Sequence, residues 1–274
     1  MKKFTTSLAA LAALSALAPM LGNAAITTIG VTGWNQDIVI NNGGGTYDTT
    51  ITGSMDNGPG SHENWTWGEA GTYPLAGGAT QVVSGLTQNV YTSATGSGAT
   101  FQFQDFAASN ALLLNTTDGT NQGTLTLTIP TSLNTLALYG STSGGPTSAT
   151  VTLHFSDSTT SVYTIANGTG IGGDWFNDGS QTAALIVGDR VSNRSDDGYT
   201  NVFYQSQDNI SIYESSITLN GDDQAKQLVS FDISNTGQGN LAIMAVSGQA
   251  VPEASAASLI AACGLVSLLR RRRA

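Results

Sequence analysis

The chain has 274 residues, of which 40% are hydrophobic and 10% charged, and its formal net charge is −10. An acidic chain repels phosphate backbones, so the composition argues against a nucleic-acid-binding protein. The only cysteine, Cys263, lies close to the C-terminus, so the rest of the chain forms no disulfide and depends on a hydrophobic core for stability.

The N-terminus has the pattern of a secretory signal peptide. Two lysines follow the first methionine, an apolar stretch occupies Leu8–Leu21, and small residues lead to Ala24. This order predicts a signal helix over residues 1–24 and cleavage by signal peptidase after Ala24 or Ala25. The alternative is an uncleaved membrane helix, which is disfavoured because Pro19 interrupts the apolar run.

Alternation of polar and apolar residues dominates residues 26–250. In Thr124–Ile129 and Thr150–Phe155 every second residue is apolar, which is typical of half-buried strands. Turn residues such as those of Asn41–Gly45 separate the candidates, and no long helix is indicated. Many short strands with frequent turns predict one all-β domain, an antiparallel β-sandwich over 26–250. The other predicted strands are Asp37–Ile40, Gln81–Val83, Thr100–Phe103, Thr135–Tyr139, Ser161–Ile165, Ala183–Val187, Val202–Tyr204, Ile210–Tyr213, Ser216–Leu219, Gln227–Ile233 and Leu241–Val246.

Trp65 and Trp67 are the candidate glycan-contacting residues. They are two positions apart, so in an extended segment both point to the same side, where paired indoles could stack on sugar rings. The competing interpretation is that both tryptophans fill the interior of a domain without disulfides. Trp175 and its neighbour Asp174 are predicted to be structural, with the indole buried at a strand end.

Two acidic clusters raise the question of metal binding. Their carboxylate and amide oxygens suit calcium, but neither cluster has the spacing of an EF-hand and ordinary Asx turns explain both. No cofactor is therefore predicted, and calcium remains the one open alternative. The clusters are Asp174, Asn177 and Asp178, and Asp196, Asp197 and Asn201.

Catalytic motifs are missing from the sequence. His62 and His154 are far apart and lack metal-ligand spacing, so His154 is predicted to be a solvated or capping residue on the polar face of its strand. No Gly-x-Ser-x-Gly motif occurs, and a Cys–His pair is excluded because Cys263 lies inside the apolar run of the predicted membrane helix. Carboxyl pairs within the acidic clusters have no spacing that selects acid–base chemistry. The prediction is that the protein is not an enzyme.

The C-terminus combines a short motif, an apolar run and a basic end. Residues 254–269 are apolar, and as a helix they would extend about 24 Å, less than the roughly 30 Å of a bilayer core. Four arginines follow, which predicts a transmembrane helix with its end in the cytoplasm. The motif comprises Val251, Pro252, Glu253 and Ala254, and the cytoplasmic anchor comprises Arg270, Arg271, Arg272 and Arg273.

This arrangement resembles the PEP-CTERM sorting signal of bacterial surface proteins, which an exosortase-type membrane enzyme is thought to recognise and process. The resemblance implies transient anchoring in the inner membrane, followed by delivery to the cell surface or the extracellular space. The family's motif has proline after the glutamate, whereas this chain has Ala254, which leaves the efficiency of processing open. A simple permanent anchor is the alternative.

Without the two terminal signals, the remaining body is more acidic than the whole chain. Residues 26–250 contain eighteen acids and only three basic residues, a net charge of −15. Such a surface keeps a protein soluble outside the cell and attracts cations. The three basic residues are Arg190, Arg194 and Lys226.

Several segments of the body resemble galactose-binding-like jelly rolls, which occur on bacterial surface proteins and beside secreted glycoside hydrolases. The resemblance implies a jelly-roll sandwich, in some cases with carbohydrate-binding function. The expected function is an exported structural or adhesive protein of the cell surface or extracellular matrix, with extracellular polysaccharide as a candidate partner. The alternatives are a carbohydrate-binding module or a secreted glycoside-hydrolase-like enzyme. The segments are Trp34–Ile40, Leu136–Gly140, Phe155–Thr160, Gly173–Phe176, Ser216–Leu219 and Ala242–Val246; where such domains often have Asp-Gly in the hairpin, this chain has Asp157-Ser158.

Overall fold

The computed structural model describes residues 24–41, 51–60, 64–74, 79–117, 119–176, 179–192 and 202–252. Its compact unit, Ala25–Ala250, consists mainly of β-strands, which confirms the predicted all-β class. Within the described ranges, helix is limited to one α-helical turn, α2 (Gly221–Gln224), and one 3-10 turn, η1 (Gly170–Gly172).

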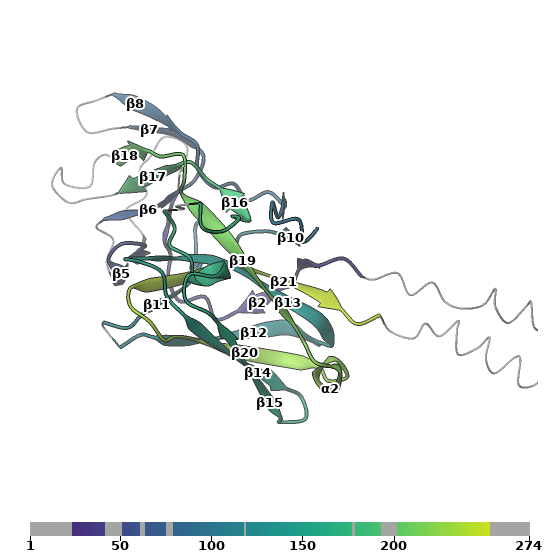
Figure 1. Ribbon diagram of the computed structural model, residues 1–274. Helices are drawn as coiled ribbons and strands as arrows, with labels where there is room; N and C mark the ends of the chain where they lie inside the picture. The colour runs from purple at the N-terminus through teal and green to yellow at the C-terminus, as the bar shows by residue number, and fades with distance from the viewer. Residues whose placement is uncertain are drawn as a thin grey trace, which may run out of the picture. The chain divides into compact units, whose positions relative to one another are not determined.

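Two sheets form the main part of this unit, and all strand pairs within them are antiparallel (Figure 1). The outer sheet has the order β15-β14-β20-β12-β2. The inner sheet has the order β1-β21-β13-β19-β16, and β11 also pairs with β21. The outer strands are β2 (Val31–Thr32), β12 (Gln122–Thr131), β14 (Ala149–Phe155), β15 (Thr160–Ile165) and β20 (Leu228–Asn235); the inner strands are β1 (Thr27–Thr28), β11 (Leu112–Asn115), β13 (Leu133–Ser143), β16 (Leu185–Ile186), β19 (Ser211–Thr218) and β21 (Asn240–Ala250).

The outer sheet is buried on one face only, as the alternating sequence predicts. Along β14, Val151 and Leu153 are buried while Thr150 and Thr152 are partly exposed. Phe231 on β20 joins the same hydrophobic cluster, which lies between the two sheets. Burial of this face against the inner sheet supplies the main hydrophobic stabilisation of the sandwich.

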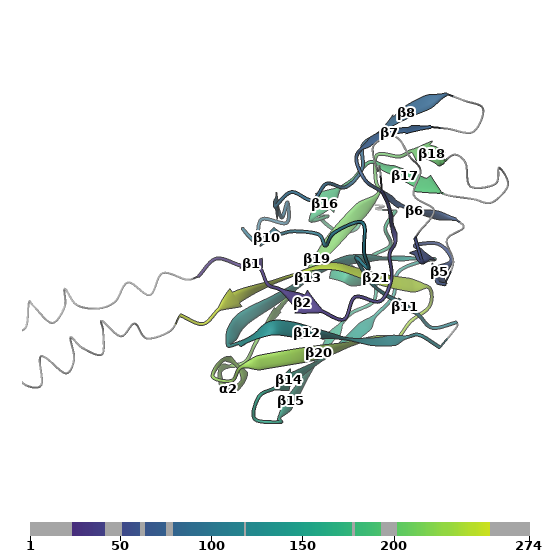
Figure 2. The ribbon, with the colours of Figure 1, turned by 180° about the vertical axis from the view of Figure 1, so that it is seen from behind.

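The central strands of the inner sheet, β13 and β21, are buried on both faces. On β13, Leu136 and Leu138 pack in the cluster shared with the outer sheet, whereas Ala137 and Tyr139 pack in a second cluster on the opposite face. Strand β21 is likewise buried from its first residue to Gly248. Figures 1 and 2 both show this sheet between the outer sheet and a further layer of short strands and loops.

A bulge in β21 changes which of its residues face the cluster between the two main sheets. The pairing of β13 with β21 shifts between Tyr139–Ala245 and Gly140–Ile243, so Met244 is the extra residue. Ile243 and Val246 are three positions apart, yet both belong to the cluster between the main sheets. A bulge of this kind reverses the alternation of side chains along a strand.

The third layer contains a lateral sheet of order β18-β17-β6-β3 and three hairpins. Strands β3 and β6 pair in parallel, so the prediction of a purely antiparallel body is wrong for this layer. The lateral strands are β3 (Val39–Ile40), β6 (Trp65–Gly68), β17 (Asp189–Ser192) and β18 (Phe203–Ser206); the hairpins are β4 (Gly53–Ser54) with β5 (Gly58–Pro59), β7 (Gly71–Pro74) with β8 (Thr80–Val83), and β9 (Tyr91–Thr92) with β10 (Thr100–Phe101).

Every predicted strand overlaps a strand of the structure, but several boundaries differ. Ile210–Tyr213 and Ser216–Leu219 are parts of one strand, β19, because a partly buried Glu214 interrupts the apolar alternation without breaking the strand. Among the strands of four or more residues, β6, β7, β11 and β17 were missed, because three of them have mixed composition and β11 is a continuous apolar run. The two-residue strands β1, β2, β4, β5 and β9 were also missed, because they are too short to show a period.

Both ends of the body are held in the inner sheet. Strand β1 pairs with the end of β21, with Thr27 opposite Gly248. None of the helices in the described ranges has the length and apolar character that a membrane crossing requires. The predicted transmembrane helix 254–269, and residues 1–23 of the predicted signal helix, lie outside those ranges.

Gly140 should be essential for stability. A Cβ atom at this position would lie 2.0 Å from the carbonyl oxygen of Ala242, so Gly140→Ala forces the bulge apart. We expect a loss of about 1–3 kcal/mol in the free energy of unfolding, measured by urea denaturation. Gly221→Ala is the matched control, because a Cβ there meets nothing within 4 Å. Equal stability of the two variants would contradict this account of the bulge.

Candidate functional site

Trp65 and Trp67 both pack in the second cluster, so they point to the same side of the lateral sheet, as predicted, and that side is largely covered. Strand β17 pairs with β6 so that Ser192 lies opposite Trp65. Trp67 has 0% of its surface exposed and packs edge-to-face against Trp175, with 5.1 Å between ring centroids. The prediction that both indoles stack on sugar rings is therefore wrong, because Trp67 belongs to the core. Trp65 remains partly exposed.

Arg190 occupies the space beside Trp65. Its guanidinium carbon lies 4.6 Å from the Trp65 ring centroid and 4.4 Å from that of Phe176, within cation–π range. Its Nε donates to Oε1 of Gln205 at 2.7 Å, and its Nη1 is 3.3 Å from Oδ2 of Asp56. The sequence did not predict this cluster around Arg190. The one available signal was that the body contains only three basic residues, so each of them has many acids as possible partners.

Burial controls the charges in this cluster. Burial raises the pKa of Asp56 to about 6; the Arg190 charge opposes this shift and the Asp174 charge adds to it. Burial also lowers the pKa of Arg190, although Asp56 counteracts the effect. For both residues the effect of burial on the pKa is larger than the opposing effect of the partner's charge. The attraction between Asp56 and Arg190 therefore offsets only part of the cost of removing their charges from water.

Asp174 has a structural role. Its Oδ2 accepts a hydrogen bond from the Gly145 N–H at 2.8 Å, and its Oδ1 accepts one from the Phe176 N–H at 2.9 Å. Trp175 is buried, as predicted. Asp174 is the only member of the two acidic clusters within the described residues, among which no group of three or more metal-ligating side chains occurs. Calcium binding stays the open alternative to the prediction of no cofactor.

His154 forms a cross-strand pair on the outer sheet. Its Nε2 lies 2.8 Å from Oδ2 of Asp232 on β20, and Thr124 on β12 donates to Oδ1 of the same carboxylate at 2.5 Å. The three side chains connect neighbouring strands on the solvent face. The second histidine, His62, is outside the described residues.

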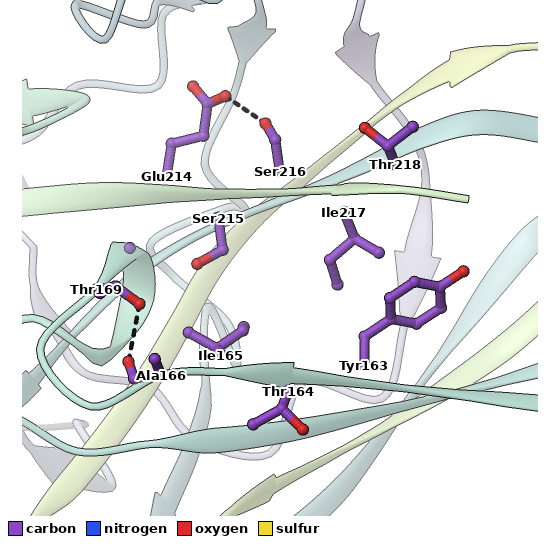
Figure 3. Close-up of a pocket in the computed structure, with 11 residues that line it drawn as sticks. Tyr163, Thr164, Ile165, Ala166, Thr169, Glu214, Ser215, Ser216, Ile217 and Thr218 are labelled. Atoms are coloured by element: carbon purple, nitrogen blue, oxygen red, sulfur yellow. Dashed lines mark hydrogen bonds between the residues drawn. The ribbon is translucent and has the colours of Figure 1, made fainter. Parts of the chain in front are cut away.

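A groove lies along the open side of the sandwich, between β15 and β19 (Figure 3). Its volume is about 460 Å³. Figure 3 shows Ser215 and Ile217 pointing from β19 towards β15, whereas Glu214, Ser216 and Thr218 point to the other side of β19. The lining residues are Tyr163, Thr164, Ile165, Ala166, Thr169, Gly170, Glu214, Ser215, Ser216, Ile217 and Thr218.

Glu214 is the only charged residue that lines the groove. Burial raises the pKa of its carboxyl group, but hydrogen bonds from the hydroxyls of Ser216, Ser93, Ser97 and Thr95 outweigh that effect and lower the pKa overall. Ser97 donates to Oε2 at 2.9 Å and Ser216 to Oε1 at 2.6 Å. The carboxylate is therefore ionised at neutral pH and fastens the 93–97 loop to β19.

The groove offers hydrogen-bonding groups around a partly apolar floor. Hydroxyls of Ser215, Thr169 and Tyr163 lie beside Ile165 and Ile217, a combination that suits a neutral polar ligand or an extended chain. Glycoside hydrolysis generally uses two carboxyl groups, and Glu214 alone among the lining residues supplies one.

Comparisons with known proteins give no further guide to these sites. No protein family matches the chain, and no curated protein sequence matches it.

The raised pKa of Asp56 makes a specific pH dependence testable. The folded protein retains a proton on Asp56 that the unfolded chain loses, so the free energy of unfolding falls as the pH rises from about 4 to about 6. The Asp56→Asn variant has no ionisable group at this position, so its free energy of unfolding lacks this fall with pH. The stability of the variant relative to wild type should increase over that interval by up to about 3 kcal/mol. Urea denaturation at several pH values measures the difference, and parallel pH profiles would refute it.

Trp175 should be essential for stability. We expect Trp175→Ala to lower the free energy of unfolding by about 3–5 kcal/mol, because a fully buried indole leaves a large cavity. The partly exposed Trp65 provides the comparison, and Trp65→Ala should be less destabilising. Thermal melts of both variants test this order, and a Trp175→Ala variant that melts like wild type would overturn the structural assignment.

Proposed function

We propose that this protein is an exported, non-catalytic component of the cell surface or extracellular matrix, with a structural or adhesive role. The proposal includes a sorting step in which an exosortase-type membrane enzyme processes the tail. The jelly-roll topology implied by the sequence resemblance is part of the same proposal.

The observation that carries the proposal is how the body ends. Strand β1 begins at Thr27, just after the predicted signal-peptidase site, and β21 ends at Ala250, just before the motif that starts with Val251. These terminal strands pair with one another. Their hydrogen bonds lie inside the compact unit, so removal of both signals would leave the sandwich complete.

Composition supports the same role. A body with a net charge of −15 is well suited to an exposed, hydrated location. Its stability rests on two hydrophobic clusters that together use both faces of the inner sheet. A sandwich of this kind needs no disulfide to persist outside the cell.

The tail provides the decisive experiment. Pro252 has no N–H and restricts Val251 to extended backbone, which leaves an accessible strip before the predicted membrane helix. We expect the surface-released protein to lack Arg270–Arg273, and a Pro252→Ala, Glu253→Ala double variant to remain in the membrane at full length. Mass spectrometry of the released form identifies its C-terminal peptide. A peptide ending in Ala274 would show that the tail is a simple anchor.

Polysaccharide binding is the second candidate function. The hydroxyl-lined groove beside Tyr163 favours it, as does the partly exposed ring of Trp65. A glycan array probed with the wild-type body, with and without calcium, tests binding. Tyr163→Ala and Trp65→Ala then distinguish the two locations, provided that each variant still melts cooperatively.

A further inference from the structure

Strand β15 (Thr160–Ile165) lies at the end of the outer sheet and pairs only with β14 among the described strands. It is six residues long, longer than any other strand at the end of a described sheet. The groove of Figure 3 runs along it. The strand therefore presents a long open edge.

The backbone groups on this edge can be assigned from the pairing with β14. The Phe155 N–H donates to the Thr159 carbonyl at 3.0 Å, so odd-numbered residues direct their main-chain groups towards β14. Directions alternate along an antiparallel strand, and the groups of Thr160, Val162 and Thr164 consequently point outward. No hydrogen bond among the described residues uses them.

The β15 edge lacks the features that normally prevent an edge strand from pairing with another chain. Its sequence, Thr-Ser-Val-Tyr-Thr-Ile, has no charge, proline or glycine, and the pairing with β14 is regular. Val162 is 62% exposed, one of five large hydrophobic side chains that are strongly exposed in the described part of the chain. Natural edge strands that stay unpaired normally carry a charge, a proline or a bulge.

We infer that β15 is a self-association surface, on which the β15 strand of a second copy pairs antiparallel about a two-fold axis at Val162. This pairing places Val162 opposite its counterpart and Thr160 opposite Thr164 of the second copy. The outward N–H and C=O groups then form about six hydrogen bonds. A two-fold contact must be self-complementary, and an uncharged edge strand meets this condition.

The charges near β15 fit this arrangement. Two copies of the acidic body repel one another, so an uncharged strand is a favourable place for contact. At the start of β15, Lys226 lies 3.9 Å from Asp157 and 3.5 Å from Asp223. The other end, Ile165–Gly170, has no charged residue. Antiparallel pairing sets the charged end of each copy against the uncharged end of the other.

The groove accommodates the inner side of the added strand. Side chains of an added strand alternate between the two faces of the outer sheet, so every second one points towards the groove. There Ile165 and Ile217 offer an apolar surface. On the solvent face, contact between the two Val162 side chains removes exposed apolar surface from water.

Disulfide cross-linking tests the register. In the full chain carrying Cys263→Ser, Val162→Cys places two thiols across the axis, at the Cα separation of about 5.5 Å that suits a disulfide. Val82→Cys is the matched control, since Val82 is 66% exposed but lies on β8. We expect mild oxidation to yield a covalent dimer with Val162→Cys and not with Val82→Cys. Equal cross-linking of the two variants would overturn the inference.

A charge pair tests the contact without oxidation. Val162→Lys alone and Val162→Glu alone should each weaken association by about tenfold or more, because like charges then face each other across the axis. An equimolar mixture should recover the dimer, and Val82→Lys should have no effect. Sedimentation velocity measures association, and thermal melts verify folding. Association of wild type should also strengthen with salt, which screens repulsion between acidic bodies. A dimer that survives Val162→Lys would refute the proposal.

Discussion

The structure depends on the burial of the two central strands of the inner sheet on both faces. Strands β13 and β21 contribute Leu138 and Ile243 to the cluster under the outer sheet, and Tyr139 and Ala242 to the cluster on the other face. The second face requires its own cover, which the lateral sheet, the hairpins and the buried indoles of Trp67 and Trp175 provide. The short strands of the third layer are therefore a consequence of how apolar the inner strands are.

The basic side chains in the described part of the body each lie near acids. Arg190 reaches the aromatic cluster with Asp56 as its partner, and Lys226 lies near Asp157 and Asp223. Elsewhere hydroxyl groups take the place of cations, as around Glu214. Hydroxyl donors stabilise a carboxylate without adding positive charge, which is how an acidic body keeps partly buried carboxylates ionised. Asp56 lacks such donors and shows the opposite shift.

The open side of the sandwich combines two kinds of binding surface. The groove joins apolar side chains to hydroxyls, and the β15 edge adds main-chain donors and acceptors. The opposite solvent face of the outer sheet is polar and cross-linked by the contacts of Asp232. A surface protein with these properties would make contacts through its side and edge, while its polar face stays hydrated.

The sequence by itself determined the all-β class and most of the outer sheet, because alternation in Thr124–Ile129 and Thr150–Phe155 reports burial of a single face. It also determined the common direction of Trp65 and Trp67, which follows from the two-residue repeat of a strand. Only the tertiary structure decided that Trp67 is buried, that Arg190 lies against Trp65, and that β15 and β19 border a groove. These features depend on contacts between segments far apart in the chain, and local periodicity carries no information about which layer covers a given face.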